Sequence, residues 1–346
     1  MINPNEFYDK TKVGVNEELI DKLLDKYLKI SYKDMNWSET DIENYKNVHG
    51  GKNPSISQLY SKINNYDDEI KPRNIKDSDL FFKEINRDFF AAGMPFDPST
   101  HGGITNPLAV MPGWYTLKSW YILGTDKIHD SDFAHRFYFG IPNDQKYRLA
   151  NVLYDEFKNA NIPFYFKINV FDEERTDNIV LYTSNALLEE TINVLRSIET
   201  KMPDLINLCG EPSIIVGKFT NKIGYASENP TLKTSYTDLI CTEFIDSLDT
   251  VLDLYANKNV NPRIINAYKS KINKYLNAGK KVEMRARRRI LLEVLLNEEP
   301  VFKSKLLDEF KKRVCADGLD LNNICFSNNS KSQMESQYDI GNSIHR

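Results

Sequence analysis

Hydrophobic residues near the N-terminus recur at the spacing of one helix face. In residues 17–30 they fall three or four positions apart, and Asn16 stands where a helix N-cap is expected. From residue 31 to about 79 the chain is polar, with glycine turns and a run of charged side chains. We therefore predict that residues 1–80 form an N-terminal region of short helices and loops.

The hydrophobic pattern changes in the central part of the chain, residues 81–260. Alternating apolar and polar positions predict strands at residues 114–123, 133–141, 163–171, 178–183, 214–216 and 223–226. Helical spacing predicts helices at residues 143–160, with Asn143 as the cap, 187–197 and 236–256. A short polar step at residues 173–177 is typical of a hairpin. We therefore predict an α+β fold with a mainly antiparallel sheet packed with helices.

The last part of the chain, residues 261–346, returns to helical spacing. Helices are predicted after Asn261, over residues 281–296 and over residues 302–314. The run RARRR at residues 285–289 is interpreted as a solvated helix face rather than as a contact for nucleic acid or an acidic peptide. The tail from about Asn322 is rich in serine and asparagine, which predicts flexibility.

Composition and charge narrow the classes of function. The 346 residues include 45 Lys+Arg and 49 Asp+Glu, and this near balance argues against bulk binding of nucleic acid. The chain has no signal-peptide core and no apolar run of about 18 residues, so we expect a cytoplasmic protein without a membrane segment. Its cysteines form no CxxC pair, which predicts reduced, buried thiols and no metal site. These are Cys209, Cys241, Cys315 and Cys325.

Side-chain alternation assigns the residues of the predicted strand 133–141 to two faces. His135, Phe137 and Phe139 share one face, and Arg136 and Tyr138 share the other. A histidine among phenylalanines is more often a buried core residue than a catalytic one. We therefore expect the chemistry of this strand to come from the second face.

The predicted strand 163–171 has the same design, with Lys167 opposite an apolar face. If the two strands are neighbours in the sheet, Lys167, Arg136 and Tyr138 converge on one polar surface. Arginine and lysine around one pocket bind phosphate well, and crowded cations favour the neutral form of a lysine. The alternative is an exposed sheet face whose cations pair with nearby carboxylates. The remaining candidates, in the connection that follows and the next strand, are Glu174, Arg175, Asp177 and Tyr182.

Several short motifs in this core occur in a shared order: HRFYFGIP, PFYFKINV, RTDNIVLYTS, PSIIVGKFTNKIGYASENP and SYTDLICTEFIDSL. They lie within a stretch of about residues 114–248, over which the resemblance described next extends. In their sequence and spacing they resemble the Hop A-type effector family of plant-pathogenic bacteria. Relatives of that family also occur as lyase components of class V lanthipeptide and thioamitide biosynthesis.

The resemblance implies elimination of phosphate from phosphoserine or phosphothreonine, which leaves dehydroalanine or dehydrobutyrine. The order of residues agrees with that of phosphothreonine lyases, because Arg136 and Tyr138 are two apart and Lys167 follows Tyr138 by 29 positions. By this resemblance Lys167 is the base that removes the Cα proton, and Arg136 and Arg175 hold the phosphate. Tyr138 stands where those lyases have a general-acid histidine.

Further residues take secondary roles by the same resemblance. Tyr182 and Asp177 would shape the pocket, and Lys218 or Lys222 would supply another phosphate contact. The segment SYTDLICTEF, in which many relatives carry a basic residue or histidine, has Leu239 and Ile240 at that place. This departure, like the tyrosine at position 138, leaves the general acid open.

The resemblance also implies partners. The reaction needs no metal and no organic cofactor, but a Ser/Thr kinase must first install the phosphate, and a cyclase can then join cysteine to the new alkene. We expect a carbon–oxygen lyase that acts on a phosphorylated ribosomal precursor peptide, with no nucleic-acid or membrane partner. The alternatives are an injected effector acting on a host phosphoprotein and a non-catalytic scaffold of the same fold that binds a peptide or protein.

Overall fold

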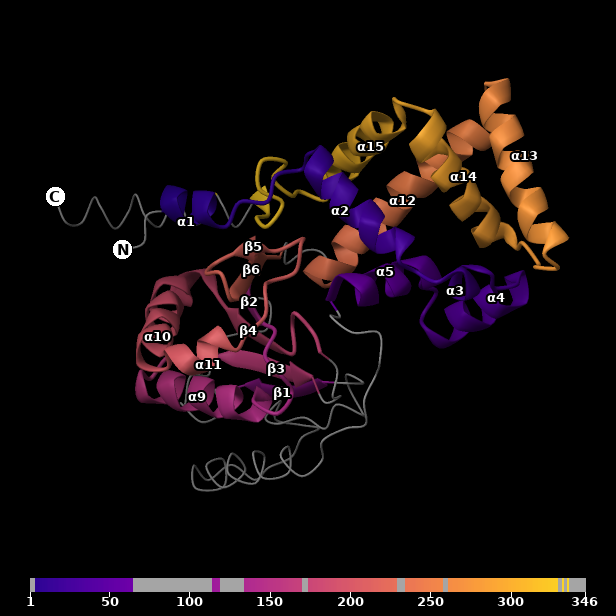
Figure 1. Cartoon of the computed structure of the whole chain (residues 1–346). Helices are drawn as coiled ribbons and strands as arrows, with labels where there is room; N and C mark the ends of the chain where they lie inside the picture. Colours follow the sequence, from indigo (N-terminus) through magenta and orange to yellow (C-terminus); the bar gives the residue numbers. More distant parts are fainter. Residues whose placement is uncertain are drawn as a thin grey trace. The chain divides into compact units, whose positions relative to one another are not determined.

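The computed structural model describes residues 4–64, 114–118, 134–169, 174–228, 234–257 and 261–328, together with residues 332 and 335. The chain forms two compact units, and it passes between them four times, after residues 13, 63, 233 and 324. One unit contains the β-sheet, and the other is helical (Figure 1). Helices from residues 14–63 and from residues 234–324, which the sequence assigned to different regions, lie together in the helical unit.

The sheet has six described strands in the order β1-β3-β4-β2-β6-β5. Their bounds are β1 Trp114–Lys118, β2 His135–Phe139, β3 Tyr165–Asn169, β4 Ile179–Thr183, β5 Gly217–Lys218 and β6 Ile223–Ser227. Every neighbouring pair is antiparallel. The predicted α+β fold with a mainly antiparallel sheet is therefore confirmed. The predicted strand residues 119–123, 133, 170 and 171 lie outside the described residues.

Two local predictions in this unit are wrong. Residues 214–216 form a turn, closed by the Val216 N–H donating to the Ser213 carbonyl at 3.2 Å, and the strand begins only at Gly217. Asn143 does not cap helix α9 (Lys146–Asn159), whose N-cap position is Gln145. The Asn143 side-chain oxygen accepts instead from the side-chain amide of Asn178, 3.4 Å away. This hydrogen bond links the segment before α9 to the segment before β4.

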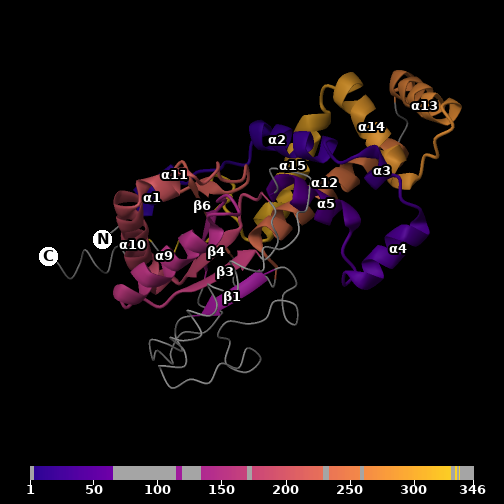
Figure 2. The same cartoon turned by 60° about the horizontal axis from the view of Figure 1, so that its bottom comes forward.

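One face of the sheet carries the core of this unit. Phe137, Phe166 and Leu181 on this face are fully buried. Helices α9 and α10 (Leu188–Lys201) cover it, and the views in Figures 1 and 2 agree on their place beside the strands. The short helices η2 (Asn185–Leu187) and α11 (Pro203–Asn207) flank α10 along the chain. The opposite face is therefore the one that carries the polar candidates.

His135 lies on the core face, as predicted. It is fully buried and hydrogen-bonds through its two ring nitrogens to the Tyr225 hydroxyl at 2.7 Å and to Asn185 Oδ1 at 2.6 Å. Burial lowers the pKa of His135 to about 4. The imidazole is therefore a neutral, hydrogen-bonded part of the core.

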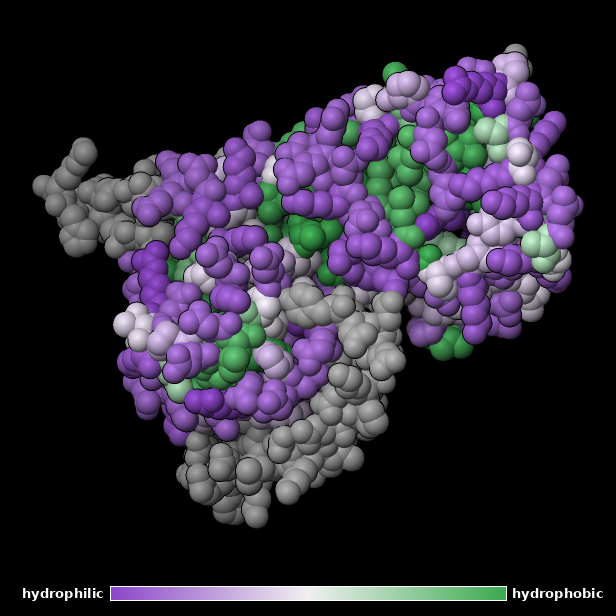
Figure 3. Space-filling model, viewed as in Figure 1, coloured by the Kyte–Doolittle hydropathy of each residue, from purple (hydrophilic) through white to green (hydrophobic). Residues whose placement is uncertain are grey.

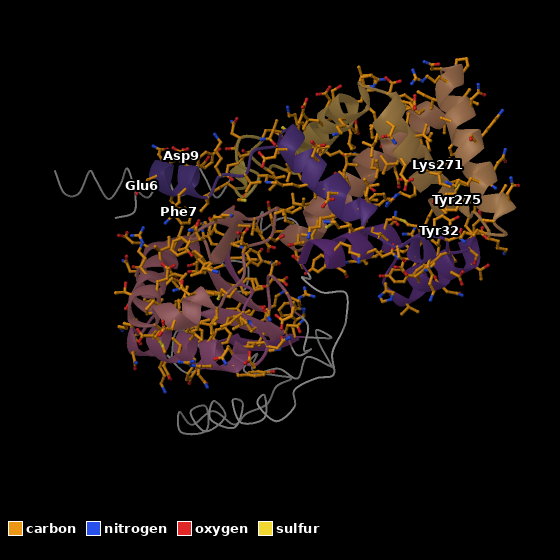
Figure 4. All side chains as sticks on the ribbon, viewed as in Figure 1. Glu6, Phe7, Asp9, Tyr32, Lys271 and Tyr275 are labelled. Atoms are coloured by element: carbon orange, nitrogen blue, oxygen red, sulfur yellow. The ribbon has the colours of Figure 1, made fainter. Side chains whose placement is uncertain are left out.

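Both ends of the described chain pack on the sheet. Helix α1 (Pro4–Lys10) directs Phe7 toward the strands while Glu6 and Asp9 lie on its outer side (Figure 4), and the rings of Phe7 and Tyr225 meet at 4.8 Å. Near the other end, the carbonyl of Cys325 accepts from the Ser227 N–H at 2.7 Å. The predicted flexibility from Asn322 is wrong for residues 323–327, which are buried because three of them are apolar.

The helical unit combines helices from both ends of the sequence. They are α2 Glu17–Leu28, α3 Tyr32–Met35, α4 Glu39–Val48, α5 Pro54–Asn64, α12 Tyr236–Asn257, α13 Pro262–Asn277, α14 Met284–Glu298 and α15 Phe302–Ala316. Asn16 caps α2 as predicted, because its side chain accepts from the Leu19 N–H at 3.0 Å. Tyr32 of α3 stacks on Tyr275 of α13 with ring centroids 4.8 Å apart, and Figure 4 labels both.

The arginine run in α14 is only partly a solvated face: Arg287 is exposed, but Arg285 and Arg289 are enclosed, so the prediction is wrong for these two. Arg285 is buried and donates to the side chains of Ser55, at 3.0 Å, and Gln58, at 2.5 Å. Arg289 donates to the carbonyl of Tyr27, at 2.8 Å, near the end of α2. Helix ends leave carbonyls without a partner in the helix, and these guanidinium groups satisfy such acceptors.

The helical unit carries large apolar side chains on its surface. On its visible face the helical unit shows an apolar area among hydrophilic residues (Figure 3), and its exposed large apolar side chains include Leu254, Ile265 and Met284. Three of the predicted buried thiols are buried, but Cys315 is exposed. Within the described ranges, no helix has the length and apolarity needed to cross a membrane.

Candidate functional site

The polar face of the sheet brings the main candidates together. Arg136 on β2 lies opposite Tyr182 on β4, which lies opposite Tyr165 on β3. In the next row, Tyr138 and Lys167 both lie opposite Val180. Directly opposed residues point to the same face. Arg136, Tyr138 and Lys167 therefore share one face, although β4 lies between the two strands that were expected to be neighbours.

Tyr182 occupies the middle of this face. The Arg136 guanidinium lies 4.6 Å from its ring centroid, and the Lys167 amine lies 5.6 Å from it. The ring of Tyr165 stacks on it at 4.3 Å with an interplanar angle of 12°. Both cations therefore lie near the ring of Tyr182, and the negative face of an aromatic ring attracts a positive charge.

We call the side chains gathered on this face the cluster: Arg136, Lys167 and Tyr182, with Trp114, Arg175, Asp177 and Glu228 described below. Lys167 is the base in it whose pKa is lowered most. Its amine lies 4.7 Å from the ring centroid of Trp114, and no carboxylate among the described residues pairs with it. Burial, and then the positive charge of Arg136, lower the pKa of Lys167 to about 7. A substantial fraction of the amine is therefore uncharged at neutral pH and able to accept a proton.

Arg136 already has an anionic partner. It donates through Nη2 to a carboxylate oxygen of Glu228, and both side chains are 13% exposed. The Nε–H of Arg136 is buried and has no hydrogen-bond partner among the described residues. The guanidinium thus keeps one donor available for another acceptor.

Arg175 is held by a carboxylate in its own segment. Its Nε and Nη2 donate to the two oxygens of Asp177 at 2.8 and 3.2 Å, and both residues are buried. This is the pairing that the alternative interpretation of the sequence predicted. The guanidinium also lies 5.4 Å from the ring centroid of Trp114, the same ring that lies near the Lys167 amine.

Gly140 lets the backbone at residues 175 and 176 approach the sheet closely. A Cβ atom at Gly140 would lie 2.6 Å from the Arg175 carbonyl oxygen and 2.7 Å from the Cα of Thr176. The backbone at residues 175 and 176 therefore crosses the polar face where β2 ends, and a side chain at residue 140 would prevent it. Glycine is required here for close approach.

Tyr138 is buried, and burial raises its pKa well above that of an ordinary phenol. The hydroxyl therefore stays protonated at neutral pH. Such a group donates a hydrogen bond readily but gives up its proton poorly. The structure places Tyr138 beside the cluster without supplying the missing acid.

Lys218 and Lys222 are not brought into the cluster. Lys218 lies on the edge strand β5, opposite Gly224, with its side chain 54% exposed and 3.8 Å from Glu211. Four strand spacings separate it from Lys167, which corresponds to roughly 19 Å. Lys222 lies in the turn between β5 and β6, outside the strands that carry the cluster.

Sequence reasoning missed two members of the site. Trp114 was assigned to a strand but not to the site, and only its pairing opposite Asn169 shows that it shares a face with Lys167. Glu228 follows the last residue of β6, and its partner Arg136 is 92 residues away. No local pattern identifies an ion pair at that separation, whereas the alternation around Trp114 did contain a usable signal.

The charges of the described cluster nearly balance. Arg136 and Arg175 face Glu228 and Asp177, and Lys167 is only partly protonated. Such a site offers a weak base beside two arginines that already have carboxylate partners. Across the described ranges, no group of three or more His, Cys, Asp or Glu side chains is arranged to hold a metal ion.

No protein-family model and no curated protein sequence matches the chain. Solved structures that are similar to it include two effector proteins. One is an effector protein from Pseudomonas syringae pv. syringae strain 61, with a TM-score of 0.39 and 9% identity, covering 89% of this chain and 98% of that one. The other is an effector protein from Pseudomonas syringae pv. tomato strain DC3000, with a TM-score of 0.40 and 12% identity, covering 85% of this chain and 99% of that one.

Proposed function

We propose that the sheet unit is a carbon–oxygen lyase that eliminates phosphate from phosphoserine or phosphothreonine. The observation that carries the proposal is the state of Lys167, an amine with its pKa lowered to about 7 and an arginine on the same sheet face. A general base works best when its pKa lies near the working pH. An ordinary lysine is protonated at neutral pH and cannot act in this way.

In the proposed reaction, Lys167 Nζ takes the proton from Cα of the phosphorylated residue. The electron pair of that C–H bond forms the Cα=Cβ double bond, and the Cβ–O bond breaks. Phosphate leaves with the electrons of the broken bond, and the lysine later returns its proton to solvent. The products are inorganic phosphate and dehydroalanine or dehydrobutyrine. This scheme uses no metal and no organic cofactor.

Arg136 is the residue best placed to stabilise the leaving phosphate. Its Nε–H has no hydrogen-bond partner among the described residues, and its guanidinium is held against Tyr182. Donors fixed where negative charge develops lower the barrier most when they are enclosed. Arg175 uses one edge of its guanidinium to bind Asp177, so in this proposal it contributes its charge and holds the segment.

The substrate we propose is a phosphorylated ribosomal precursor peptide of the lanthipeptide type. A Ser/Thr kinase must then act before this enzyme, and a cyclase can consume its product by adding cysteine thiols to the alkene. The sequence motifs support this assignment. An injected effector that acts on a host phosphoprotein would use the same residues and the same chemistry.

A second candidate function is a non-catalytic module that binds a peptide or protein. It is favoured by one observation, which is that both arginines of the cluster already pair with carboxylates. A site used only for recognition needs no free base. The two candidates differ in whether Lys167 matters for a covalent change.

Mass spectrometry of a phosphothreonine peptide incubated with the full chain separates them. The proposal expects loss of the elements of phosphoric acid and an alkene that a thiol traps. Lys167→Met should lower the rate by roughly 100-fold or more, the contribution of a positioned general base. Lys218→Met removes a lysine from the same sheet face outside the cluster, so it should leave the rate unchanged.

Other results would replace the proposal. Conversion to the unphosphorylated alcohol means a phosphatase. Binding without any covalent change, in the presence of kinase and precursor peptide, means a recognition module. Elimination by Lys167→Met at the unsubstituted rate removes Lys167 from the role of base.

A further inference from the structure

Glu228 is a member of the cluster that the proposed reaction does not use. It follows β6, and its N–H donates to the Ala134 carbonyl at 2.6 Å, so its backbone is tied to the residue before β2. The preceding residue, Ser227, donates its N–H to the Cys325 carbonyl at 2.7 Å. The carboxylate is therefore presented to Arg136 from a fixed main chain rather than from a free loop.

The two arginine–carboxylate pairs of the cluster differ in how firmly they are held. Asp177 binds Arg175 through both oxygens, with side chains only 9% and 6% exposed. Glu228 meets Arg136 through Nη2 alone on the arginine side, with both side chains 13% exposed. Bidentate pairs are stronger and more specific in geometry than pairs through one donor. Arg136 therefore binds its carboxylate through fewer donors than Arg175 does.

Arg136 keeps a buried donor that Glu228 does not use. Its guanidinium packs 4.6 Å from the ring centroid of Tyr182, and its Nε–H has no partner among the described residues. Nε and Nη2 lie on one edge of a guanidinium and together match two oxygens of a phosphate. An anion that takes this whole edge competes with Glu228 for Nη2.

We infer that Glu228 is a resident anion that holds the place on Arg136 where a substrate phosphate binds. Anion binding at this site is then an exchange, in which the incoming group replaces one carboxylate. A singly charged carboxylate gains little over Glu228, whereas a phosphate dianion brings more charge and a second acceptor. Glu228 thus lowers the affinity of the site for competing anions, and an anion binds there only when its contacts with Arg136 are more favourable than those of the carboxylate. The inference rests on the proposed function only in naming the anion as the phosphate of a modified serine or threonine.

Titration calorimetry of the full chain with inorganic phosphate and with acetate tests this role. Glu228→Gln removes the competing charge and should bind phosphate roughly tenfold more tightly, equivalent to about 1.4 kcal/mol. The same variant should gain affinity for acetate by a similar factor, because acetate must also displace Glu228. Glu211→Gln removes a carboxylate beside Lys218, outside the cluster, and should leave both affinities unchanged. Equal or weaker phosphate binding by Glu228→Gln overturns the inference.

A second variant keeps the test decisive if Glu228→Gln does not fold. Glu228→Asp retains the charge but draws it one methylene away from Arg136, so phosphate affinity should rise by a smaller factor; no rise overturns the inference. Turnover is measured separately by mass spectrometry. Tighter phosphate binding without elimination by the unsubstituted chain keeps the exchange and removes the lyase. Elimination by the unsubstituted chain, without tighter phosphate binding by the variants, supports the lyase and overturns the exchange at Glu228.

Discussion

Replacing Lys167 with methionine should stabilise the protein at neutral pH, although it removes a residue of the candidate site. The pKa of the amine falls from 10.5 to about 7 in the folded chain, mainly through burial. Between these two values the unfolded chain binds more protons than the folded chain. The free energy of unfolding therefore rises as the pH rises through this interval. At neutral pH the lysine opposes folding, and an uncharged side chain of similar length removes that cost.

The size of the effect follows from the shift. Each pKa unit corresponds to about 1.4 kcal/mol, so the whole shift sets a ceiling of about 5 kcal/mol. Lys167 is only half-buried, and solvent screening lowers this ceiling. We expect Lys167→Met to be more stable than the unsubstituted chain by about 2–3 kcal/mol at pH 7. At pH 9 this stability difference should be smaller than at pH 7 by about 1–2 kcal/mol.

Urea unfolding at several pH values, followed by circular dichroism and by tryptophan fluorescence, measures this difference. Lys218→Met is the matched control, because the side chain of Lys218 is 54% exposed and its loss should change stability little at each pH. A stability difference for Lys167→Met that does not change with pH, or that grows toward pH 9, would refute the desolvation of Lys167. The base assignment would then lose its physical basis.

Three further substitutions test other parts of the structure by thermal or urea unfolding. Gly140→Ala should destabilise the chain by about 2–3 kcal/mol through a clash with backbone, whereas Gly14→Ala, whose added Cβ has its nearest contact at 3.5 Å, should cost less than about 1 kcal/mol. Arg285→Met should cost about 3 kcal/mol by leaving buried acceptors unpaired, and Arg263→Met, with a side chain 77% exposed, should be nearly neutral. Burial and neighbouring carboxylates raise the pKa of Glu243 to about 7, so the folded chain binds more protons above pH 4.5 and loses stability as the pH rises to 7. Glu243→Gln should therefore stabilise the chain at pH 8 and have little effect at pH 4; an equal effect at both pH values contradicts this assignment.

Much of the fold was predictable because its signals are local. The N-cap at Asn16 and the helix that follows depend on residues three and four positions apart, and the structure shows them as predicted. Strand alternation likewise placed Arg136, Tyr138 and Lys167 on one face, since that assignment needs only a period of two. The order of the strands was not local information, so the position of β4 between β2 and β3 could not be foreseen.

The features that the sequence could not predict depend on distant partners. The charge of Arg285 indicated exposure, but Ser55 and Gln58, more than 200 positions away, enclose it. Glu228 has no neighbour in sequence that marks it, because Arg136 lies on another strand. Tertiary contacts decide the environment of a charged side chain, and a pattern of charge along the chain does not contain them.

The four passages of the chain between its two units have a consequence for folding during synthesis. About 170 residues separate Ile63, the last residue of the N-terminal part of the helical unit, from Thr234, where that unit resumes. At 5–20 residues per second, α2 to α5 wait roughly 10–30 s for their partner helices to be made. The apolar faces of the early helices are exposed throughout this interval. The sheet unit is also incomplete until Phe326 reaches Tyr225, so neither unit completes its fold before residues 324–326 have been made.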